Sequence, residues 1–264
     1  MFFKGEVGVF DFRGKTALVT GGTTGIGFST AIMLAKNGAG VAVVGRDDKK
    51  GTEALEQLTQ IKKENIYIKG DVSKTADCRR IVQETSSMLG RLDILVNSAG
   101  VFMEGPIETV SETDYYRIMD INVKGTFFMC KFVLPELRKA GGGSIVNVSS
   151  DSGITGNTHA PLYCASKGAV TIFTKALAVD VARENIRVNC VCPGDIQTPM
   201  LDREAAVAEN PETYRANMVR HYPAGRVGRP EEVAATICFL SSHMAPFVVG
   251  AAWSIDGGLT SFSY

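Results

Sequence analysis

The stretch Thr16-Ala17-Leu18-Val19-Thr20-Gly21-Gly22-Thr23-Thr24-Gly25-Ile26-Gly27 decides how this chain folds. Its first five residues are mostly apolar or β-branched and predict a buried strand, after which a glycine-rich turn leads into a helix-forming segment. Gly21 permits a tight turn, Gly25 lets the backbone approach a pyrophosphate, and Gly27 lets the helix pack on the strand. The helix N-terminus adds free N–H groups and a partial positive charge. Alone, the loop is also explained as an ordinary glycine-rich turn. The residues predicted to hold a dinucleotide here are Gly21, Thr23, Thr24, Gly25, Ile26 and Gly27.

Short β-branched runs alternate with amphipathic stretches along the rest of the chain. Near-continuous apolar strands separated by helices predict a parallel sheet that is covered on both faces. We find no long linker, so residues 1–264 are expected to form one doubly wound α/β domain of the Rossmann type with a seven-stranded parallel sheet. The expected strands are Thr16–Thr20, Gly40–Gly45, Ile66–Lys69, Leu92–Asn97, Ser144–Val148, Ile186–Val191 and Ala251–Ile255, and expected helices include Phe28–Asn37, Lys74–Leu89, Glu112–Leu137 and Tyr163–Glu184.

Composition excludes several classes of function. Lys+Arg and Asp+Glu both number 28, so the chain lacks the basic excess typical of proteins that bind nucleic acid or acidic membranes. The uncharged run from Val233 to Ile255 is punctuated by Pro246 and Gly250 and is interpreted as a buried helix and strand instead of a membrane span. Six cysteines without a C-x-x-C pair, and only three histidines, argue against a metal site and favour reduced thiols in a cytoplasmic protein.

Tyr163 and Lys167 stand at the start of an apolar, helix-forming stretch. Their spacing of four places both side chains on one helical face. A free phenol, with a pKa near ~10, is a poor proton shuttle at neutral pH. A cation ~4 Å away lowers that pKa by roughly three units at an effective dielectric of about 20, so we expect Tyr163 to titrate near ~7 and to suit general acid–base catalysis. Alone, the pair is better explained by a surface tyrosine and lysine that happen to lie four residues apart.

Other polar residues follow the predicted strands, and ligands of such sheets collect at the carboxyl ends of the strands. Ser150 stands just beyond the strand Ser144–Val148, where its hydroxyl could bind a substrate oxygen. The strand that ends at Asn97 continues into the small residues Ser98-Ala99-Gly100. Asn122 lies inside a predicted helix, where asparagine is mildly unfavourable, although an exposed or tolerated amide would explain it too.

Together these residues resemble the short-chain dehydrogenase/reductase family, from Phe12-Arg13-Gly14-Lys15 to Asp256-Gly257-Gly258. The T-G-x-x-x-G-I-G loop, Tyr163 and Lys167 occur in the family's order and spacing. Ser98 replaces the family's usual second asparagine, a change that should retain the turn. The remaining marks of the resemblance are Asn97-Ser98-Ala99-Gly100, Asn122, Ser150 and Pro193-Gly194.

The resemblance implies an enzyme and assigns roles to matching positions. Tyr163 would be the catalytic acid/base, and Lys167 would lower its pKa while holding the nicotinamide ribose. Ser150 would orient the carbonyl oxygen, and Asn122 would support a water in the proton relay. The implied cofactor-binding set adds Asp71 and Val72 at the adenine and Pro193, Gly194 and Thr198 at the nicotinamide. It also includes Asn97, Ala99, Gly100, Tyr163, Lys167 and Ile196.

The end of the second strand favours one cofactor. An acid there would accept hydrogen bonds from a ribose 2′-hydroxyl and select NAD. The strand ends instead at Gly45, followed by Arg46, whose planar fork suits a 2′-phosphate. Thr24 stands where many NADP-preferring relatives have a basic residue, so the prediction of NADP(H) depends mainly on Arg46. Asp47 could still reach a ribose, which leaves NAD(H) as the alternative.

The implied reaction is reversible hydride transfer between the nicotinamide and a secondary alcohol or its ketone. In this family the segment matching residues 199–222 forms a lid over the substrate. Apolar residues in and near it would favour a medium-sized hydrophobic or cyclic substrate if they line the pocket, although they could equally pack the lid onto the body. They are Met200, Leu201, Tyr214, Met218, Tyr222, Phe102, Met103, Ile154 and Leu162.

Two other functions stay open. One is reduction of a 3-oxoacyl-thioester in fatty-acid synthesis. An acidic carrier protein binds best to a basic surface, but the net charge of this chain is zero. The other is a non-catalytic dinucleotide-binding sensor, which would tolerate loss of the tyrosine or lysine. The family also implies a homotetramer, and the runs 233–255 and 259–264 fit buried subunit contacts as well as they fit an intrachain core.

Overall fold

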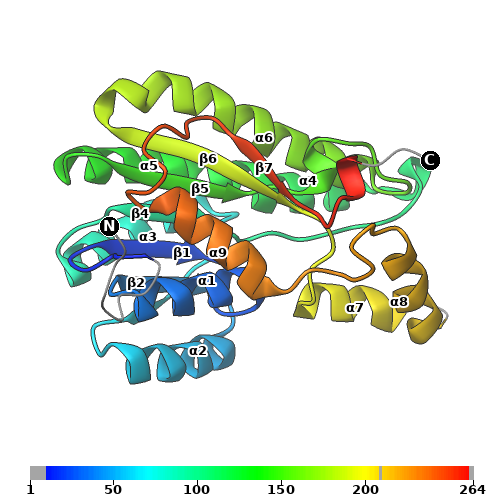
Figure 1. Cartoon of the computed structure of the whole chain (residues 1–264), viewed down its shortest axis with the longest axis horizontal. Helices are drawn as coiled ribbons and strands as arrows, with labels where there is room; N and C mark the ends of the chain where they lie inside the picture. Colours follow the sequence, from blue (N-terminus) through cyan, green and yellow to red (C-terminus); the bar gives the residue numbers. More distant parts are fainter. Residues whose placement is uncertain (1–9, 208–209, 262–264) are drawn as a thin grey trace, which may run out of the picture.

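The computed structural model describes residues 10–207 and 210–261 and builds them around a seven-stranded sheet in the order β3-β2-β1-β4-β5-β6-β7 (Figure 1). Every neighbouring pair of strands is parallel, which confirms the predicted sheet. The strands are β1 (Thr16–Thr20), β2 (Gly40–Gly45), β3 (Ile66–Lys69), β4 (Ile94–Asn97), β5 (Gly143–Val148), β6 (Ile186–Pro193) and β7 (Ala252–Ile255).

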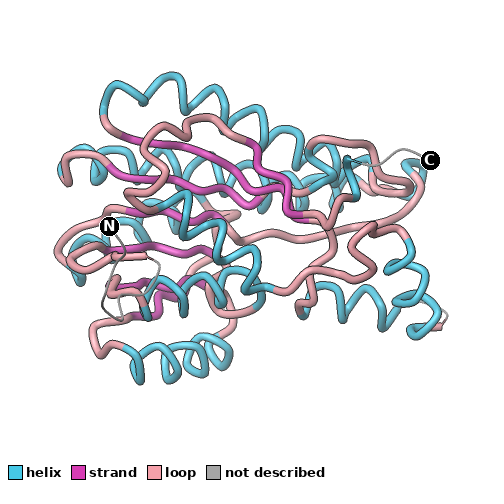
Figure 2. The backbone as a smooth tube through the Cα atoms, viewed as in Figure 1, coloured by secondary structure: helices cyan, strands magenta, loops and turns pink. Residues whose placement is uncertain are grey.

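Helices cover both faces of this sheet (Figure 2). One face carries α1, α2 and α9, and the other carries α3, α5 and α6. The helices are α1 (Gly25–Lys36), α2 (Asp48–Ile61), α3 (Thr75–Leu89), α4 (Glu112–Met119), α5 (Thr126–Lys139), α6 (Pro161–Val181), α7 (Pro199–Val207), α8 (Pro211–Arg220) and α9 (Pro230–Ser241).

The double covering explains why the strands are apolar at successive positions. Successive side chains of a strand point to opposite faces of the sheet. Leu18 therefore packs in the cluster under α3, α5 and α6, whereas its neighbours Ala17 and Val19 pack in the cluster under α1 and α9. All three side chains are fully buried. An alternating apolar and polar strand could not satisfy both faces.

The strands end in register at one edge of the sheet. Thr20 at the end of β1 pairs with Val44 of β2 and with Asn97 of β4. Val148 at the end of β5 pairs with Val191 of β6. The loops that follow these strands therefore leave the sheet side by side, as expected for a doubly wound fold.

The expected helix Glu112–Leu137 is interrupted. The chain forms α4, then a π-helical segment at Asp120–Gly125, and then α5. Asn122 lies in that segment, where its Oδ1 accepts from the Val101 N–H at 2.9 Å and its Nδ2 donates to the Val101 carbonyl at 3.0 Å. A wider turn at this point lets an asparagine bind a neighbouring loop from inside a helix, which the apolar periodicity does not reveal.

Two helices, α7 and α8, stand beyond the carboxyl edge of the sheet (Figure 1). The expected lid segment is divided into two helices, because Pro211 begins α8 and the Asn210 side chain caps it by accepting from the Thr213 N–H at 3.0 Å. Residues 208–209 of the expected lid and residues 262–264 of the expected subunit contact lie outside the described residues.

The uncharged run Val233–Ile255 becomes the end of α9, a turn and β7, as predicted. Among residues 10–207 and 210–261, the model contains no helix that combines the length and the apolar character needed for a membrane span.

Candidate functional site

A cleft of about 1100 Å³ opens at the carboxyl edge of the sheet. Its wall is built from the loops after β1 to β6 together with α7 and α8. Most of the predicted site residues line it, namely Gly21, Thr23, Thr24, Gly25, Ile26, Arg46, Asp71, Val72, Ala99, Gly100, Ser150, Tyr163, Lys167, Pro193, Gly194, Ile196 and Thr198. Three predicted residues, Gly27, Asn97 and Asn122, do not reach the wall.

The glycine turn after β1 is packed too closely for side chains. A Cβ atom on Gly27 would lie 2.3 Å from the Gly21 carbonyl oxygen, and one on Gly22 would lie 2.7 Å from the Val19 carbonyl oxygen. Gly21 and Gly25 both have positive φ angles, of 63° and 57°. The bare backbone of this turn and the start of α1 form a cradle that fits a pyrophosphate. Gly27 thus acts by letting α1 approach β1.

The end of β2 has no room for an acidic side chain. A Cβ on Gly45 would lie 2.7 Å from the Thr23 Cγ2 atom. The Asp47 Oδ1 atom is occupied as the cap of α2, because it accepts from the N–H groups of Lys49 and Lys50 at 3.0 and 3.2 Å. Arg46 is exposed on the cleft wall and forms no ion pair with another described residue. Lys50 also lines the cleft, and sequence reasoning missed it.

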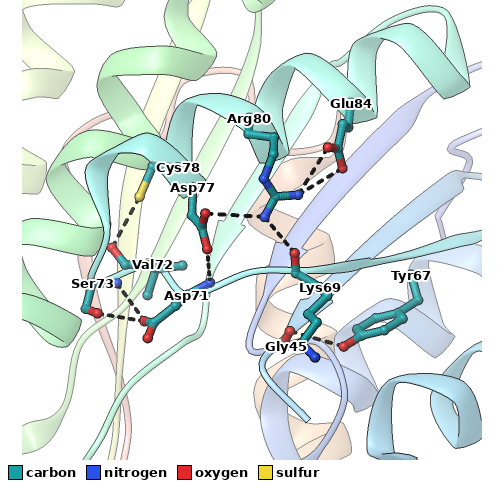
Figure 3. A network of polar contacts seen from close by, with 10 residues as sticks. All are labelled: Gly45, Tyr67, Lys69, Asp71, Val72, Ser73, Asp77, Cys78, Arg80 and Glu84. Atoms are coloured by element: carbon teal, nitrogen blue, oxygen red, sulfur yellow. Dashed lines mark hydrogen bonds and ion pairs between the residues drawn. The ribbon is translucent and has the colours of Figure 1, made fainter. Parts of the chain in front are cut away.

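A polar network holds the loop after β3 (Figure 3). The Asp71 N–H donates to the Asp77 carboxylate at 2.8 Å, and the Arg80 guanidinium donates to the Lys69 carbonyl at 2.8 Å. Arg80 also lies 3.4 Å from the Asp77 carboxylate. The first turn of α3 is thereby tied to the end of β3. This arrangement presents Asp71 and Val72 to the cleft, where an adenine was expected.

Tyr163 and Lys167 face the cleft from the first turns of α6. Both are nearly buried, with exposed fractions of 9% and 6%. The Lys167 Nζ atom donates to the Val148 carbonyl at 2.8 Å and lies 5.7 Å from the centre of the Tyr163 ring. The Tyr163 ring also packs edge-on against Phe102, with ring centres 4.8 Å apart. The predicted pair is therefore assembled on one helical face.

The pKa values of this pair differ from expectation. Burial lowers the pKa of Lys167 to about 8. Burial also raises the pKa of Tyr163, the nearby Ser150 hydroxyl lowers it in part, and the charge of Asp151 raises it further. The prediction that Lys167 holds the pKa of Tyr163 near ~7 is therefore wrong for these residues by themselves. The ammonium lies over the ring, and loss of water outweighs its attraction for a phenolate.

Asn122 and Asn97 hold the walls in place without lining the cleft. The Asn122 Nδ2 atom donates to the Ser166 hydroxyl at 3.1 Å, and that hydroxyl donates to the Tyr163 carbonyl at 2.8 Å. These two hydrogen bonds fix the start of α6 against the loop after β4. The Asn97 Nδ2 atom donates to the Asn147 Oδ1 atom at 2.9 Å and ties β4 to β5. Both asparagines are almost fully buried.

Ser150 begins a short 3₁₀ turn after β5. Its Oγ atom donates to the Asp151 Oδ1 atom at 2.6 Å and accepts from the Ser152 N–H at 3.2 Å. The other carboxylate oxygen of Asp151 accepts from the Asn157 Nδ2 atom at 3.0 Å. Asp151 is only 7% exposed. Its position directly after a predicted strand was the signal that could have identified it.

The expected apolar wall is present in part. Phe102, Met200, Leu201, Tyr214, Met218 and Tyr222 line the cleft, whereas Met103, Ile154 and Leu162 do not. Sequence reasoning missed four carboxyl groups on the same wall, which come from separate segments of the chain. They are Glu104, Asp151, Asp195 and Glu204, and none of them forms an ion pair with another residue of the described part of the chain.

Glu204 is the most perturbed carboxyl group of this wall. Burial, together with the charges of Asp195 and Glu104, raises the pKa of Glu204 to about 7, although the charge of Arg203 lowers it in part. Burial likewise raises the pKa of Asp195. The part of the cleft under α7 is therefore rich in hydrogen-bond acceptors, with Arg203 beside them, whereas the part beside α2 carries Arg46 and Lys50 together with Asp47.

Comparison with known proteins gives consistent matches over nearly the whole chain. Residues 21–260 match a family described as enoyl-(acyl carrier protein) reductase. The chain is 41% identical to an uncharacterized oxidoreductase of Thermotoga maritima, over 95% of this chain and 99% of that one. It is 38% identical to the L-fucose dehydrogenase of Mus musculus (94% and 89% covered) and 34% identical to a 3-oxoacyl-[acyl-carrier-protein] reductase of Chlamydia pneumoniae (94% and 97% covered).

Solved structures agree with these matches. A protein of Sinorhizobium meliloti assigned as a short-chain alcohol dehydrogenase superimposes with a TM-score of 0.91 at 33% identity, covering 97% of this chain and all of that one. The aldohexose dehydrogenase of Thermoplasma acidophilum superimposes with a TM-score of 0.88 at 30% identity, covering 96% and 97%.

The raised pKa of Glu204 predicts a pH-dependent stability. The folded chain keeps this proton up to a pH of about 7, whereas an unperturbed glutamate loses it near 4.5, so the folded state binds more protons between these values. Stability should therefore fall as the pH rises from about 4.5 to about 7. Glu204→Gln should flatten this fall and raise the urea midpoint at pH 7.5. Glu212→Gln, which removes a carboxyl from an exposed position on α8, is the control, and equal pH slopes for all three proteins would contradict the assignment.

Proposed function

The chain belongs to the short-chain dehydrogenase/reductase family, as an NAD(P)-dependent oxidoreductase acting on CH–OH groups, and we propose that it interconverts a secondary alcohol and its ketone with NADP(H) as the preferred cofactor. One observation carries the proposal. Tyr163, Lys167 and Ser150 line the same cleft as the glycine turn, although they come from segments more than a hundred residues further along the chain. Their order and spacing match the family's catalytic set.

The proposed proton transfer uses the buried phenol. When bound, the nicotinamide cofactor supplies or takes up the hydride. Tyr163 gives its proton to the substrate oxygen during reduction and takes one from the alcohol during oxidation. Hydrogen-bond donors stabilise the charge that develops on this oxygen. Ser150 lies beside Tyr163 for this purpose, and Lys167, still mostly protonated at pH 7, holds the nicotinamide ribose. Asn122 supports the relay by fixing the start of α6.

The preference for NADP(H) is supported by the end of β2. The Thr23 side chain crowds the place of an acid at Gly45, and one oxygen of the Asp47 carboxylate is engaged in capping α2. A 2′-phosphate would meet Arg46 and Lys50, whereas a ribose 2′-hydroxyl would have only the second oxygen of Asp47, which lies 3.9 Å from the Lys50 Nζ atom. NAD(H) is the alternative cofactor, and direct binding distinguishes the two.

A hydroxylated ring is the substrate class that the cleft favours. Carboxylates accept hydrogen bonds from hydroxyl groups, and side-chain amides both accept and donate them. Glu204, Asp195 and Asn217 line the wall together with apolar side chains. A purely hydrophobic or steroid-like ring would leave these polar groups without partners, which is costly once water is excluded. The similarity to an L-fucose dehydrogenase and an aldohexose dehydrogenase supports the same class.

Two rival functions have weaker support. Reduction of a 3-oxoacyl-thioester agrees with the names of three relatives and with the description of the matching family, but the carboxyl groups of Glu104, Asp195 and Glu204 on the cleft wall do not favour an acidic carrier protein. A non-catalytic sensor would not need tyrosine, lysine and serine together on one wall.

We also infer that the chain forms a single domain, with residues 199–222 as a lid over the substrate. The helices α7 and α8 supply Leu201, Glu204 and Tyr214 to the cleft wall, which supports that role. All six cysteines are free thiols. Location in the cytoplasm stays a prediction.

The homotetramer stays a proposal as well, supported by two exposed apolar surfaces. On α5 and α6, Phe127, Ile172 and Val179 are 46%, 64% and 78% exposed, and near β7 Phe247 and Trp253 are 99% and 41% exposed. Two separate surfaces are what a tetramer with two kinds of contact requires. Sedimentation equilibrium should give four times the chain mass of 28.3 kDa, and Val179→Asp should reduce it to a dimer. A monomeric wild-type protein at working concentration would remove the idea.

Replacement of Tyr163 by Phe tests the proposed reaction directly. Tyr163→Phe should lower turnover by at least about a thousandfold, because it removes the group that moves the proton. Binding of NADPH, measured by fluorescence titration, should stay unchanged. Tyr116→Phe, at a position that is 55% exposed, is the control. Substantial residual turnover in the Tyr163 variant would refute the assignment.

Replacement of Arg46 tests the cofactor preference. Arg46→Ala should weaken NADPH binding by roughly tenfold or more, since one charge-assisted contact to a phosphate is lost, and should leave NADH binding almost unchanged. Fluorescence titration of both cofactors measures this without turnover. Lys49→Ala is the control, because Lys49 is an exposed neighbouring cation that does not line the cleft. Equal losses for the two cofactors would contradict the role of Arg46.

A further inference from the structure

We propose that Asp151 is a positioning residue that fixes the direction of the Ser150 hydrogen bond, so that the site binds an alcohol more tightly than the matching ketone. The inference rests on the proposed function, because it assumes that the substrate oxygen lies between Ser150 and Tyr163. It concerns a residue that the resemblance to the family does not assign.

The geometry leaves Ser150 few choices. A serine hydroxyl has one hydrogen and two lone pairs. The hydrogen points to Asp151 Oδ1 at 2.6 Å, and one lone pair accepts from the Ser152 N–H at 3.2 Å. A backbone N–H can only donate, so this contact cannot reverse. The second lone pair is left for the cleft, whose wall Ser150 lines beside Tyr163.

Asp151 is itself held in one orientation. Its Oδ2 atom accepts from the Asn157 Nδ2 atom at 3.0 Å, and that nitrogen also donates to the Ser152 hydroxyl at 2.7 Å. The carboxylate is 7% exposed, and no cation among the described residues pairs with it. A buried carboxylate without a cation depends strongly on its hydrogen-bond donors. The Ser150 hydroxyl is therefore kept as a donor to Asp151.

This direction distinguishes the two substrates. With Tyr163 protonated, the phenol donates to the oxygen of an alcohol or of a ketone alike. The hydroxyl hydrogen of an alcohol can also donate to the free lone pair of Ser150, but a ketone has no such hydrogen and places its own lone pairs there. One hydrogen bond is gained by the alcohol alone, which corresponds to roughly a two- to tenfold preference in Kd.

During the reaction the serine has to turn. As negative charge develops on the substrate oxygen, the Ser150 hydrogen exchanges one anionic acceptor, Asp151, for another. Asp151 therefore stabilises the resting alcohol complex. Its hydrogen bond from Ser150 breaks when negative charge develops on the substrate oxygen. Because the overall equilibrium constant belongs to the substrates, a variant that changes the ratio of the alcohol and ketone affinities must change the equilibrium between the two bound complexes by the opposite factor.

Replacement of Asp151 by Asn should reverse this hydrogen bond. Asn157 still needs an acceptor, so the new amide oxygen faces Asn157 and the new amide nitrogen faces Ser150. That nitrogen donates to Ser150 and frees the serine hydrogen for the cleft. The ketone should then bind more tightly and the alcohol more weakly.

The measurement uses cyclohexanol and cyclohexanone, which differ only at the reacting oxygen. Their Kd values are measured at pH 7 by ligand-detected NMR in the wild-type protein and the Asp151→Asn, Ser150→Ala and double variants, with a tetrahydronicotinamide analogue of NADPH bound, which cannot transfer a hydride to the ketone. The ratio of the ketone Kd to the alcohol Kd should exceed one in the wild type and fall by roughly two- to tenfold in Asp151→Asn. In the Ser150→Ala protein, the Asp151 substitution should have no further effect on the ratio. A purely structural role would weaken both probes equally.

An unchanged ratio in Asp151→Asn, or the same change with and without Ser150, would overturn the inference. Asp151→Ala serves as a second variant if Asp151→Asn fails to fold. If the cyclohexyl probes bind too weakly, product-inhibition constants of a ring alcohol and ketone that are turned over give the same ratio. Loss of turnover with a retained binding preference would defeat only the proposed function, whereas turnover with an unchanged ratio would defeat only the role of Asp151.

Discussion

The alignment of the strand ends is the constraint on which the rest of the structure depends. Pairing of Thr20 with Val44 and Asn97, and of Val148 with Val191, brings the loops after five strands to one edge. Residues far apart in the sequence meet there because the strands are parallel and end at the same edge of the sheet. The hydrogen bond between Asn97 and Asn147 stabilises this register within the buried sheet, where a slip would leave polar groups without partners.

Burial gives the edge its chemical character. The cleft carries cations beside α2 and carboxyl groups under α7, so the two ends select different parts of a bound complex. Around Tyr163 the loss of water dominates: burial raises the pKa of the phenol and lowers that of Lys167. The resting site therefore holds a protonated phenol and a buried ammonium. Asp151 adds a carboxylate that accepts a hydrogen bond from the Ser150 hydroxyl.

Most of the fold, and much of the candidate site, could be predicted from the sequence because both follow from local patterns. β1, β2 and β3 have the predicted bounds, and the glycine turn and the pair Tyr163 and Lys167 have fixed spacing. The break at Asn122, the burial that raises the pKa of Tyr163, and the acidic wall could not be predicted in this way. Glu204 and Asp195 become neighbours of Tyr163 only through the path of the chain after β6. The hydrophobic periodicity of the sequence does not predict that path.

The most direct test of the account is the absorbance of the reduced nicotinamide band when NADP⁺ or NAD⁺ is offered with a panel of alcohols. The panel contains L-fucose and D-glucose as hydroxylated rings, cyclohexanol, a steroid alcohol and a 3-hydroxyacyl-thioester. We predict that a hydroxylated ring reacts fastest and that NADP⁺ outperforms NAD⁺. Fastest turnover of the steroid or the thioester, or no turnover at all by a protein that binds NADPH, would contradict the account.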